Sequence, residues 1–137
     1  MIPQVTRTAP VFRSFDEAKA RAFYLDWLGF TWVGEHRFDA DAPLYAFLRL
    51  GEFHLHLSEH HGDATPGSSV MVHVDNLRAW HASLPPYANM RPGLDPLPWG
   101  LQMQVWDPFG NRLNFLDQKD GKSLPDKAAG IAKSILD

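Results

Sequence analysis

The sequence predicts an α+β fold made of two similar modules, each with one strand, one helix and three further strands. Twice along the chain a short β-rich run is followed by an acidic residue and a helical pattern, from Phe12 to Ala18 and again from Met71 to Leu77. After each helix, runs of β-forming or alternating apolar and polar residues, bounded by turn residues, indicate strands. An internal repeat of roughly 55 residues is typical of folds built from two copies of one unit. Two such modules together can bury sheets that neither could bury alone.

The first module is expected over residues 6–58. Pro10 removes one ladder donor near the start of its first strand, which places that strand at an edge, at a bulge or across a subunit boundary. Asp16 is the expected N-cap of the helix, and Gly29 its C-terminal cap. The apolar stripe of this helix is predicted to be Ala18, Ala22, Leu25 and Leu28, with Phe23 beside it. The predicted elements are a strand over 6–15, a helix over 16–28, and strands over 30–35, 44–50 and 53–58.

The second module is expected over residues 69–117, after a turn-rich linker at 59–68. Asp75 or Asn76 is the expected cap of its helix. Its last two strands form a hairpin, since Pro108 presets the backbone for a turn and Gly110 or Asn111 accepts a positive φ. The predicted elements are strands over 69–74 and 101–106, a helix over 77–84, a weak strand over 87–91, a proline-rich loop over 92–98 and a strand over 112–117.

The remaining residues, 121–137, are predicted to form a helical extension after one domain over 1–120. Within it, Lys122 to Asp137 is the expected surface helix, with Ile131, Ile135 and Leu136 as its apolar contacts.

Composition restricts the class of protein. The chain has 137 residues, of which 45% are hydrophobic and 21% charged, as in an ordinary soluble domain. It has no cysteine, no apolar run long enough to span a bilayer and no signal-peptide pattern, so we expect a cytoplasmic protein. The net charge of −3 and the scattered basic residues argue against nucleic-acid and membrane partners. Nine Phe, five Trp, three Tyr and seven His stand out and supply candidates for a binding site.

A series of short motifs follows in order between Thr8 and Asp117. These motifs are Ala9-Pro10-Val11, Ala22-Phe23-Tyr24, Leu28-Gly29-Phe30, the run from Gly51 to Ser58, Val74-Asp75, and Asp107-Pro108-Phe109-Gly110-Asn111. In order and spacing they resemble the vicinal-oxygen-chelate superfamily, also called the glyoxalase/bleomycin-resistance superfamily. The resemblance implies paired βαβββ modules that form a curled open sheet, in a homodimer.

Within that superfamily the sequence is most similar to bleomycin-binding resistance proteins. Pro98-Trp99-Gly100 resembles the segment in which those proteins hold a ligand-stacking tryptophan. Tyr45 falls where they carry another pocket aromatic. Pro10 falls where they use a proline as the hinge for exchanging the N-terminal strand between subunits.

The same resemblance indicates which positions would hold a metal in the enzymes of the superfamily. They are Ala9, His56, Ser69 and Asn114. Only His56 is a good ligand, because alanine has no donor and serine and asparagine are poor substitutes for His, Glu or Asp. We therefore expect neither a metal nor another cofactor, and a binding protein rather than an enzyme.

The histidines offer one alternative. His54 and His56 share a strand face and, with His60 or His61, could form a metal cluster. The simpler interpretation places His54, His56 and His73 on a half-polar sheet face, with the loop histidines in solvent. No nucleophile elbow or phosphate-binding glycine loop occurs in the sequence.

Aromatic and polar residues supply the candidate ligand site. Trp99, Tyr45, Phe38 and Trp106 could line a slot for a planar ligand, whereas Trp27 and Trp32 are assigned to the core. Arg112 and Asn114 alternate on one face of the last strand and could hydrogen-bond the ligand. The alternatives are burial in the core for the rings and solvent exposure for the polar pair. The predicted ligand-binding residues are Trp99, Tyr45, Phe38, His56, Arg112 and Asn114.

The function expected from these features is metal-independent binding or sequestration of a small planar or aromatic molecule. A bleomycin-type antibiotic, which is cationic, is the named candidate and implies a role in antibiotic resistance. The alternative is a metal-dependent lyase, dioxygenase or isomerase of the same superfamily. A third possibility is a protein that has lost its binding or catalytic site and only dimerises. A homodimer is also expected because so aromatic a sheet would otherwise expose apolar patches.

Overall fold

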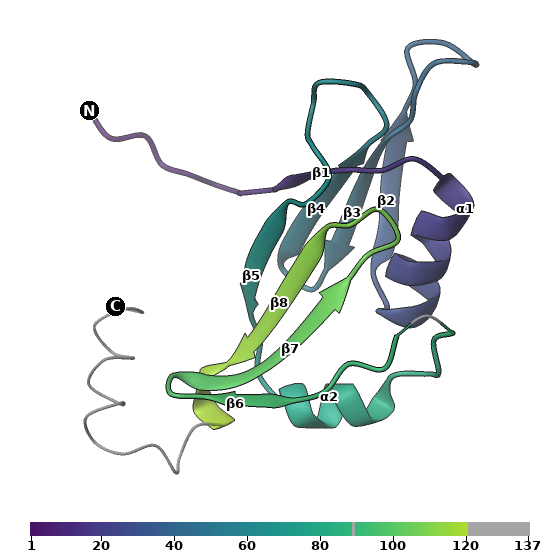
Figure 1. Cartoon of the computed structure of the whole chain (residues 1–137). Helices are drawn as coiled ribbons and strands as arrows, with labels where there is room; N and C mark the ends of the chain where they lie inside the picture. The colour runs from purple at the N-terminus through teal and green to yellow at the C-terminus, as the bar shows by residue number, and fades with distance from the viewer. Residues whose placement is uncertain (89, 121–137) are drawn as a thin grey trace. The chain divides into compact units, whose positions relative to one another are not determined.

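The computed structural model describes residues 1–88 and 90–120 and forms two compact units, each with its own four-stranded sheet (Figure 1). The first unit comprises Met1–Ser68 and Trp106–Arg112, and the second comprises Ser69–Val105 and the chain from Leu113 on. The elements are β1 (Val11–Arg13), α1 (Glu17–Ala20), η1 (Arg21–Trp27), β2 (Thr31–His36), β3 (Tyr45–Leu50), β4 (Phe53–Ser58), β5 (Ser69–His73), α2 (Leu77–Ser83), β6 (Asp95–Leu97), β7 (Gly100–Trp106), β8 (Arg112–Asp117) and η2 (Gln118–Asp120). The predicted helix over 122–137 lies outside the described residues.

The two sheets have the same strand order, which confirms the repeated module. The first runs β1-β4-β3-β2 and the second β5-β8-β7-β6. In the first sheet β1 pairs with β4 in parallel, and the β2–β3 and β3–β4 pairs are antiparallel. No helix in the described part of the chain is long and apolar enough to cross a membrane.

The core of the first unit lies between one face of its sheet and the helix formed by α1 and η1. Asp16 caps this helix as predicted, because its carboxylate accepts a hydrogen bond from the Lys19 amide at 3.0 Å. η1 is a π-helix, in which the Leu28 amide donates to the Phe23 carbonyl five residues earlier. The buried side chains that this helix, its C-terminal cap, β3 and β4 contribute to the core are Ala20, Phe23, Tyr24, Trp27, Leu28, Ala46, Leu48, Leu55 and Leu57.

The predicted apolar stripe of this helix was therefore partly wrong. Ala18 and Ala22 are exposed, and Tyr24, which the prediction left out, is fully buried next to Phe23. The wider turn of η1 changes which residues from Arg21 on face the sheet, and a 3.6-residue period does not anticipate that change. Trp27 is in the core as expected. Trp32 is only half-buried, and the Arg21 guanidinium lies 3.9 Å from the centre of its ring.

The turn between β7 and β8 belongs to the first unit and is fixed there by side-chain hydrogen bonds. The Asp107 carboxylate accepts bonds from the backbone amides of Phe109 and Asn111 and from the Tyr24 hydroxyl. The Asn111 side chain donates to the Arg13 carbonyl at 2.8 Å and so ties the turn to β1. Gly110 has a φ of +89°, the conformation the turn was predicted to need.

In the second unit, the buried carboxylate of Asp117 replaces the predicted cap of α2. Asn76 has a φ of +58° and makes no side-chain capping bond, whereas Asp117 Oδ2 accepts from the Leu77 amide at 3.1 Å. Position 100 has no room for a side chain, which explains the glycine there. A Cβ at that position would lie 2.7 Å from the Asp117 carbonyl oxygen.

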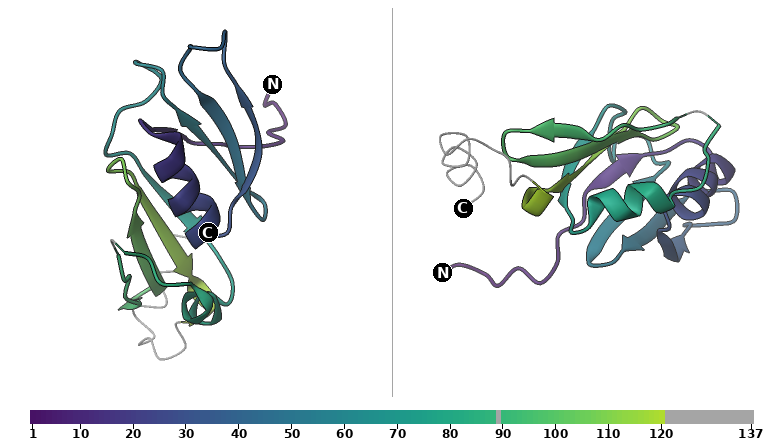
Figure 2. Two further views of the ribbon diagram at one scale, coloured as in Figure 1. Left: turned by 90° about the vertical axis from the view of Figure 1, so that its right-hand side faces the viewer. Right: turned by 90° about the horizontal axis from the view of Figure 1, so that it is seen from below.

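Three further strand predictions need correction. The first strand was expected over 6–15 but covers only Val11–Arg13, and residues 1–9 extend away from it outside any described strand (Figures 1 and 2). The weak strand predicted over 87–91 is an isolated bridge between Tyr87 and Met90. The fourth strand of this module is instead β6, inside the stretch predicted as a proline-rich loop. Prolines are tolerated there because β6 is an edge strand.

Candidate functional site

The candidate site begins on the face of the first sheet opposite its helix. Tyr45 and Phe47 alternate with the buried Ala46 and Leu48 along β3, so their side chains point away from the core. The register pairs Phe47 with His56 on β4, which brings His56 onto the same face. We call these three half-buried residues, Tyr45, Phe47 and His56, the Tyr45 surface.

The Tyr45 surface is held together by ring contacts and one hydrogen bond. The Tyr45 hydroxyl oxygen and His56 Nδ1 are 2.8 Å apart. The His56 ring meets the Phe47 ring edge-on with centroids 4.9 Å apart, and it lies 5.3 Å from the Tyr45 ring. The tilted pair of Tyr45 and Phe47 has a centroid separation of 5.4 Å. Three flat rings on one strand pair thus surround a single polar contact.

Burial shifts the pKa values of both residues in this polar contact, His56 and Tyr45. Burial lowers the pKa of His56 below its ordinary 6.5, and the nearby His54 and Arg7 lower it further. Burial also raises the pKa of Tyr45 above 10.0, with a smaller contribution from the charge of Asp63. At neutral pH the contact therefore joins a phenol to an uncharged imidazole. When the phenol donates to Nδ1, the proton of the imidazole is on Nε2 and is available to a ligand.

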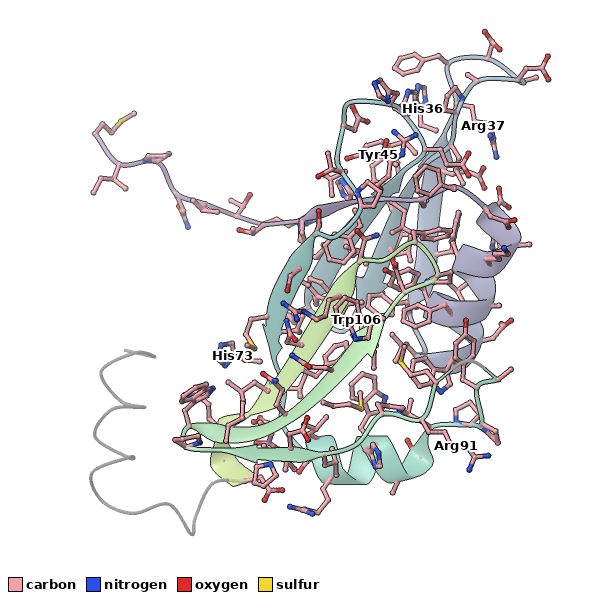
Figure 3. The ribbon with its side chains drawn as sticks, in the orientation of Figure 1. His36, Arg37, Tyr45, His73, Arg91 and Trp106 are labelled. Carbon is pink, nitrogen blue, oxygen red and sulfur yellow. The ribbon has the colours of Figure 1, made fainter. Side chains whose placement is uncertain are left out.

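Phe38, another predicted site residue, lies in the loop between β2 and β3 and is 78% exposed. Its ring contacts are with His36 at 4.6 Å and His60 at 5.8 Å between centroids. Figure 3 shows His36 and Tyr45 near the same end of this sheet. The loop therefore places an exposed ring between two imidazoles, and the structure does not include it in the Tyr45 surface.

Arg112 lies at the start of β8, and its guanidinium carbon is 5.1 Å from the centre of the Trp106 ring. Trp106 is 50% exposed at the end of β7, where Figure 3 labels it. On β1, Arg13 makes a similar contact with Phe15 at 4.8 Å. We call these four residues the arginine–aromatic surface, and all of them belong to the first unit.

The other two predicted site residues belong to the second unit. Asn114 is buried and its side-chain amide donates to Ser69 Oγ at 3.0 Å and to the Val70 carbonyl at 3.3 Å. Its Oδ1 is buried without a partner in the described residues. Trp99 is half-buried in the two-residue turn between β6 and β7.

The residues at the four metal positions do not fit a metal. His56 uses Nδ1 in its contact with Tyr45, while Ser69 and Asn114 hydrogen-bond to one another. Ala9 has no donor atom. Throughout residues 1–88 and 90–120 no three His, Cys, Asp or Glu side chains are grouped so that they could hold an ion. The proposed cluster of His54 and His56 with His60 or His61 is therefore not formed.

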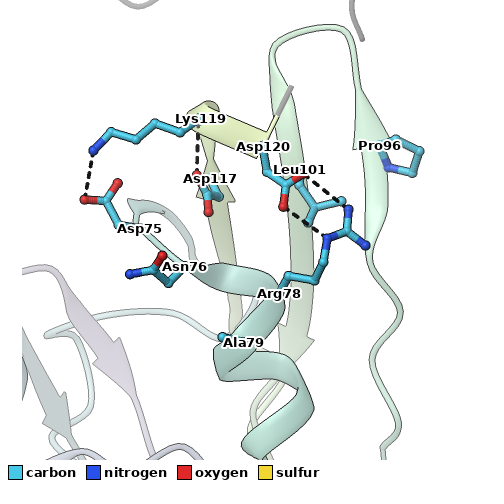
Figure 4. Close-up of a pocket in the computed structure, with 9 residues that line it drawn as sticks. All are labelled: Asp75, Asn76, Arg78, Ala79, Pro96, Leu101, Asp117, Lys119 and Asp120. Carbon is cyan, nitrogen blue, oxygen red and sulfur yellow. Dashed lines mark hydrogen bonds and ion pairs between the residues drawn. The ribbon is translucent and has the colours of Figure 1, made fainter. Parts of the chain in front are cut away.

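A cavity of about 910 Å³ in the second unit is a separate feature (Figure 4). It is lined by Asp75, Asn76, Arg78, Ala79, Pro96, Leu101, Asp117, Lys119 and Asp120. Its two cationic side chains are already paired, Arg78 with Asp120 and Lys119 with Asp75, and Asp117 accepts hydrogen bonds from two backbone amides. None of the predicted site residues lines it.

Sequence reasoning missed three residues of these surfaces. Phe47 follows Tyr45 by two positions, so the period of the strand already placed both rings on one face. Arg13 and Phe15 lie two positions apart within the strand predicted over 6–15, so the same period placed their side chains on one face.

Comparison with known proteins gives a consistent result. The family model described as "Glyoxalase superfamily protein" matches residues 3–122. A search of the curated proteins found no match.

Solved structures show the same fold. The antibiotic-binding protein TnmS3 of Streptomyces sp. CB03234 is 20% identical with a TM-score of 0.67, and the match covers 86% of this chain and 99% of that one. The bleomycin-binding protein of Streptomyces verticillus, complexed with copper(II)-bleomycin, is 27% identical with a TM-score of 0.60, over 85% and 98% of the two chains. The bleomycin resistance determinant encoded on the transposon Tn5 is 21% identical with a TM-score of 0.59, over 84% and 99%.

Proposed function

The chain belongs to the glyoxalase superfamily, and from that premise we propose that it binds a small planar or aromatic molecule without a metal. Binding of this kind sequesters the molecule and leaves it chemically unchanged. A bleomycin-type antibiotic is the named candidate, because the bleomycin-binding protein of Streptomyces verticillus is 27% identical to this chain.

The observation that carries the proposal is the Tyr45 surface. Flat ligands stack on aromatic rings with a gain of about 0.5–1.5 kcal/mol per ring beyond the burial of apolar area. The contact between Tyr45 and His56 adds a polar group at a fixed place among the rings, and such a group orients a ligand. Tyr45, Phe47 and His56 therefore supply both affinity for a flat ligand and a polar contact that fixes its orientation.

The same residues argue against the metalloenzyme alternative. A catalytic metal needs three or four good ligands, and only His56 among the four inherited positions is one. Its Nδ1 is already engaged by the Tyr45 hydroxyl. A lyase, dioxygenase or isomerase that depends on such a metal would lack its central group.

Further ligand contacts and the assembly are part of the proposal. Trp99, Phe38, Arg112 and Asn114 are the additional residues expected to contact the ligand. The protein is proposed to act as a cytoplasmic homodimer in which the N-terminal strand is exchanged. Exposed apolar side chains in residues 1–10 support the dimer, because Met1, Ile2 and Val5 are each more than 70% exposed.

The test is calorimetric titration with bleomycin, both metal-free and loaded with copper(II). Wild-type protein is expected to bind one ligand per chain. Tyr45→Phe and His56→Gln remove the polar contact and are expected to weaken binding about tenfold. His61→Gln, at an exposed loop position, is the matched control and should bind as the wild type does.

Two outcomes contradict the proposal. One is the absence of heat with bleomycin and with a panel of planar aromatic compounds. The other is a ligand whose affinity is the same in the wild type, Tyr45→Phe and His56→Gln.

A further inference from the structure

Two arginine side chains in the first unit lack partners that arginine normally has. Nε of Arg13 and Nε of Arg112 are both buried and make no hydrogen bond within the described residues. Among those residues the ion pairs of arginine involve Arg21, Arg37 and Arg78 only. A buried, unpaired donor on a cationic group is costly, so such a group is expected to have a partner in the working protein.

The two backbone segments that carry these arginines are joined through the β7–β8 turn. The side chain of Asn111, the residue before Arg112, donates to the backbone carbonyl of Arg13 at 2.8 Å. Asn111 is fully buried and also donates to Asp107, so this link is fixed. The backbone of Arg112 is anchored as well, because its amide donates to the Ser68 carbonyl at 2.9 Å.

Each guanidinium is supported by an aromatic ring. Arg13 lies over Phe15 at 4.8 Å and Arg112 over Trp106 at 5.1 Å. Phe15 and Trp106 are 58% and 50% exposed. A guanidinium stacked on a ring keeps its in-plane N–H groups free to form a fork with a planar anion.

The carboxylate of this turn does not supply the missing partner. Asp107 Oδ1 accepts from two backbone amides, and Oδ2 accepts from Tyr24 and from the Asn111 side chain. Its four acceptor positions are therefore in use.

The geometry points to an anion-binding subsite formed by Arg13 and Arg112, with Phe15 and Trp106 beside it, that recognises the acidic group of an aromatic ligand. The inference rests on the proposed small-molecule binding and specifies its ligand class. The acidic group is a carboxylate or a phosphate-type group, since both match the guanidinium fork. A bleomycin-type cation offers the two guanidinium groups no anion to pair with, so binding of an acidic aromatic molecule distinguishes this ligand class from bleomycin.

The experiment observes the two arginines directly. In ¹⁵N-labelled protein the Nε–H resonances of Arg13 and Arg112 are followed by NMR while benzoate, phenylphosphonate or inorganic phosphate is added. Benzamide, a neutral molecule of the same shape as benzoate, is the matched probe. We expect benzoate or phenylphosphonate to shift both resonances with one saturation curve, and benzamide and inorganic phosphate to bind at least tenfold more weakly. The acid that binds more tightly identifies the carboxylate or the phosphate class.

Substitutions of Arg13 and Arg112 then test whether both side chains bind the acid. Arg13→Gln and Arg112→Gln are each expected to weaken binding of the acid about tenfold or more. Arg112→Lys keeps the charge but loses the fork, and it should weaken binding as well. Arg91→Gln removes one charge from an exposed side chain of the other unit, labelled in Figure 3, and should leave the affinity unchanged.

Several results overturn the inference. These are equal affinity for benzoate and benzamide, a shift of only one arginine resonance, or an affinity for the acid that neither arginine variant changes. If bleomycin binds at the Tyr45 surface while no acid binds, the anion subsite is wrong and the proposed function survives. If neither bleomycin nor any aromatic probe binds, both are wrong.

Discussion

The hydroxyl of Tyr24 donates a hydrogen bond of 2.7 Å to Oδ2 of Asp107, although the two residues are 83 positions apart in the sequence. Tyr24 is fully buried in η1, and Asp107 begins the turn between β7 and β8. The bond therefore fixes the turn, and with it Trp106 and Arg112, against the helix of the first unit. Burial raises the pKa of Tyr24 well above its ordinary value, so the hydroxyl remains a donor.

Tyr24→Phe is predicted to lower the free energy of unfolding by about 1–3 kcal/mol, because it leaves a buried carboxylate oxygen short of one donor. Tyr45→Phe removes the same atom from a half-buried ring and should cost less than about 1 kcal/mol of stability. Urea denaturation of both variants measures the difference. Equal losses of stability in the two variants would mean that the hydrogen bond from Tyr24 to Asp107 stabilises the fold no more than the contact between Tyr45 and His56, which contradicts the prediction.

The pH dependence of ligand binding should follow His56. Its pKa is lowered, chiefly by burial, so the imidazole stays neutral until the pH falls below 6.5. Protonation of Nδ1 removes the acceptor for the Tyr45 hydroxyl, so affinity is expected to be constant from pH 8 to 7 and to fall in acid. The unfolded chain binds this proton more tightly, so unfolding also becomes easier as the pH drops below 6.5. An NMR titration of His56 that gives a pKa above 6.5 would contradict this prediction.

Two tryptophans should respond in opposite ways to truncation. Trp99→Ala is predicted to weaken ligand binding by about 1–3 kcal/mol with little loss of stability, since the ring is half-buried in a turn. Trp27→Ala empties a core position that is 4% exposed and should cost about 3–5 kcal/mol of stability. Thermal unfolding and calorimetry separate the two effects. If Trp99→Ala destabilises the fold and leaves affinity unchanged, Trp99 is a structural residue.

Assembly is predicted to depend on the N-terminal residues. Residues 1–9 pair with no strand in the described part of the chain, and apolar side chains among them are exposed. Full-length protein should be a dimer by light scattering, and deletion of residues 1–9 should weaken or abolish it. This deletion keeps Pro10, whose carbonyl accepts the His56 amide at 3.0 Å. A dimer unchanged by the deletion contradicts strand exchange, and a monomeric full-length protein contradicts the dimer itself.

Much of the fold could be predicted from local chemistry. The strand Phe53–Ser58 and the strand Arg112–Asp117 were predicted with their observed ends, because alternation and glycine-containing turns define them. The cap at Asp16 was also predicted, since it depends on residues three positions apart. By contrast, the cap of α2 comes from Asp117, 40 residues away, which no local pattern indicates.

The site was less predictable than the fold. The strands predicted over 44–50 and 53–58 leave a two-residue turn that already pairs Phe47 with His56. The hydrogen bond between Tyr45 and His56 also depends on side-chain conformations, which the sequence does not specify. The prolines near β6 led to the prediction of a loop there, but β6 is an edge strand, and an edge strand tolerates prolines that a central strand excludes. The unpartnered Nε atoms of Arg13 and Arg112 depend on tertiary burial and leave no signal in the sequence.

The central claim, binding without a metal, is tested most directly by measuring metal content and affinity on the same sample. Protein purified without chelator is analysed for its elements, dialysed against EDTA, and titrated with bleomycin before and after dialysis. The account predicts far less than one transition-metal ion per chain and the same affinity in both titrations, because the inherited metal positions hold Ala9, Ser69 and Asn114 beside the engaged His56. A bound Ni, Zn, Fe or Mn ion near one per chain, whose removal abolishes binding, would contradict it.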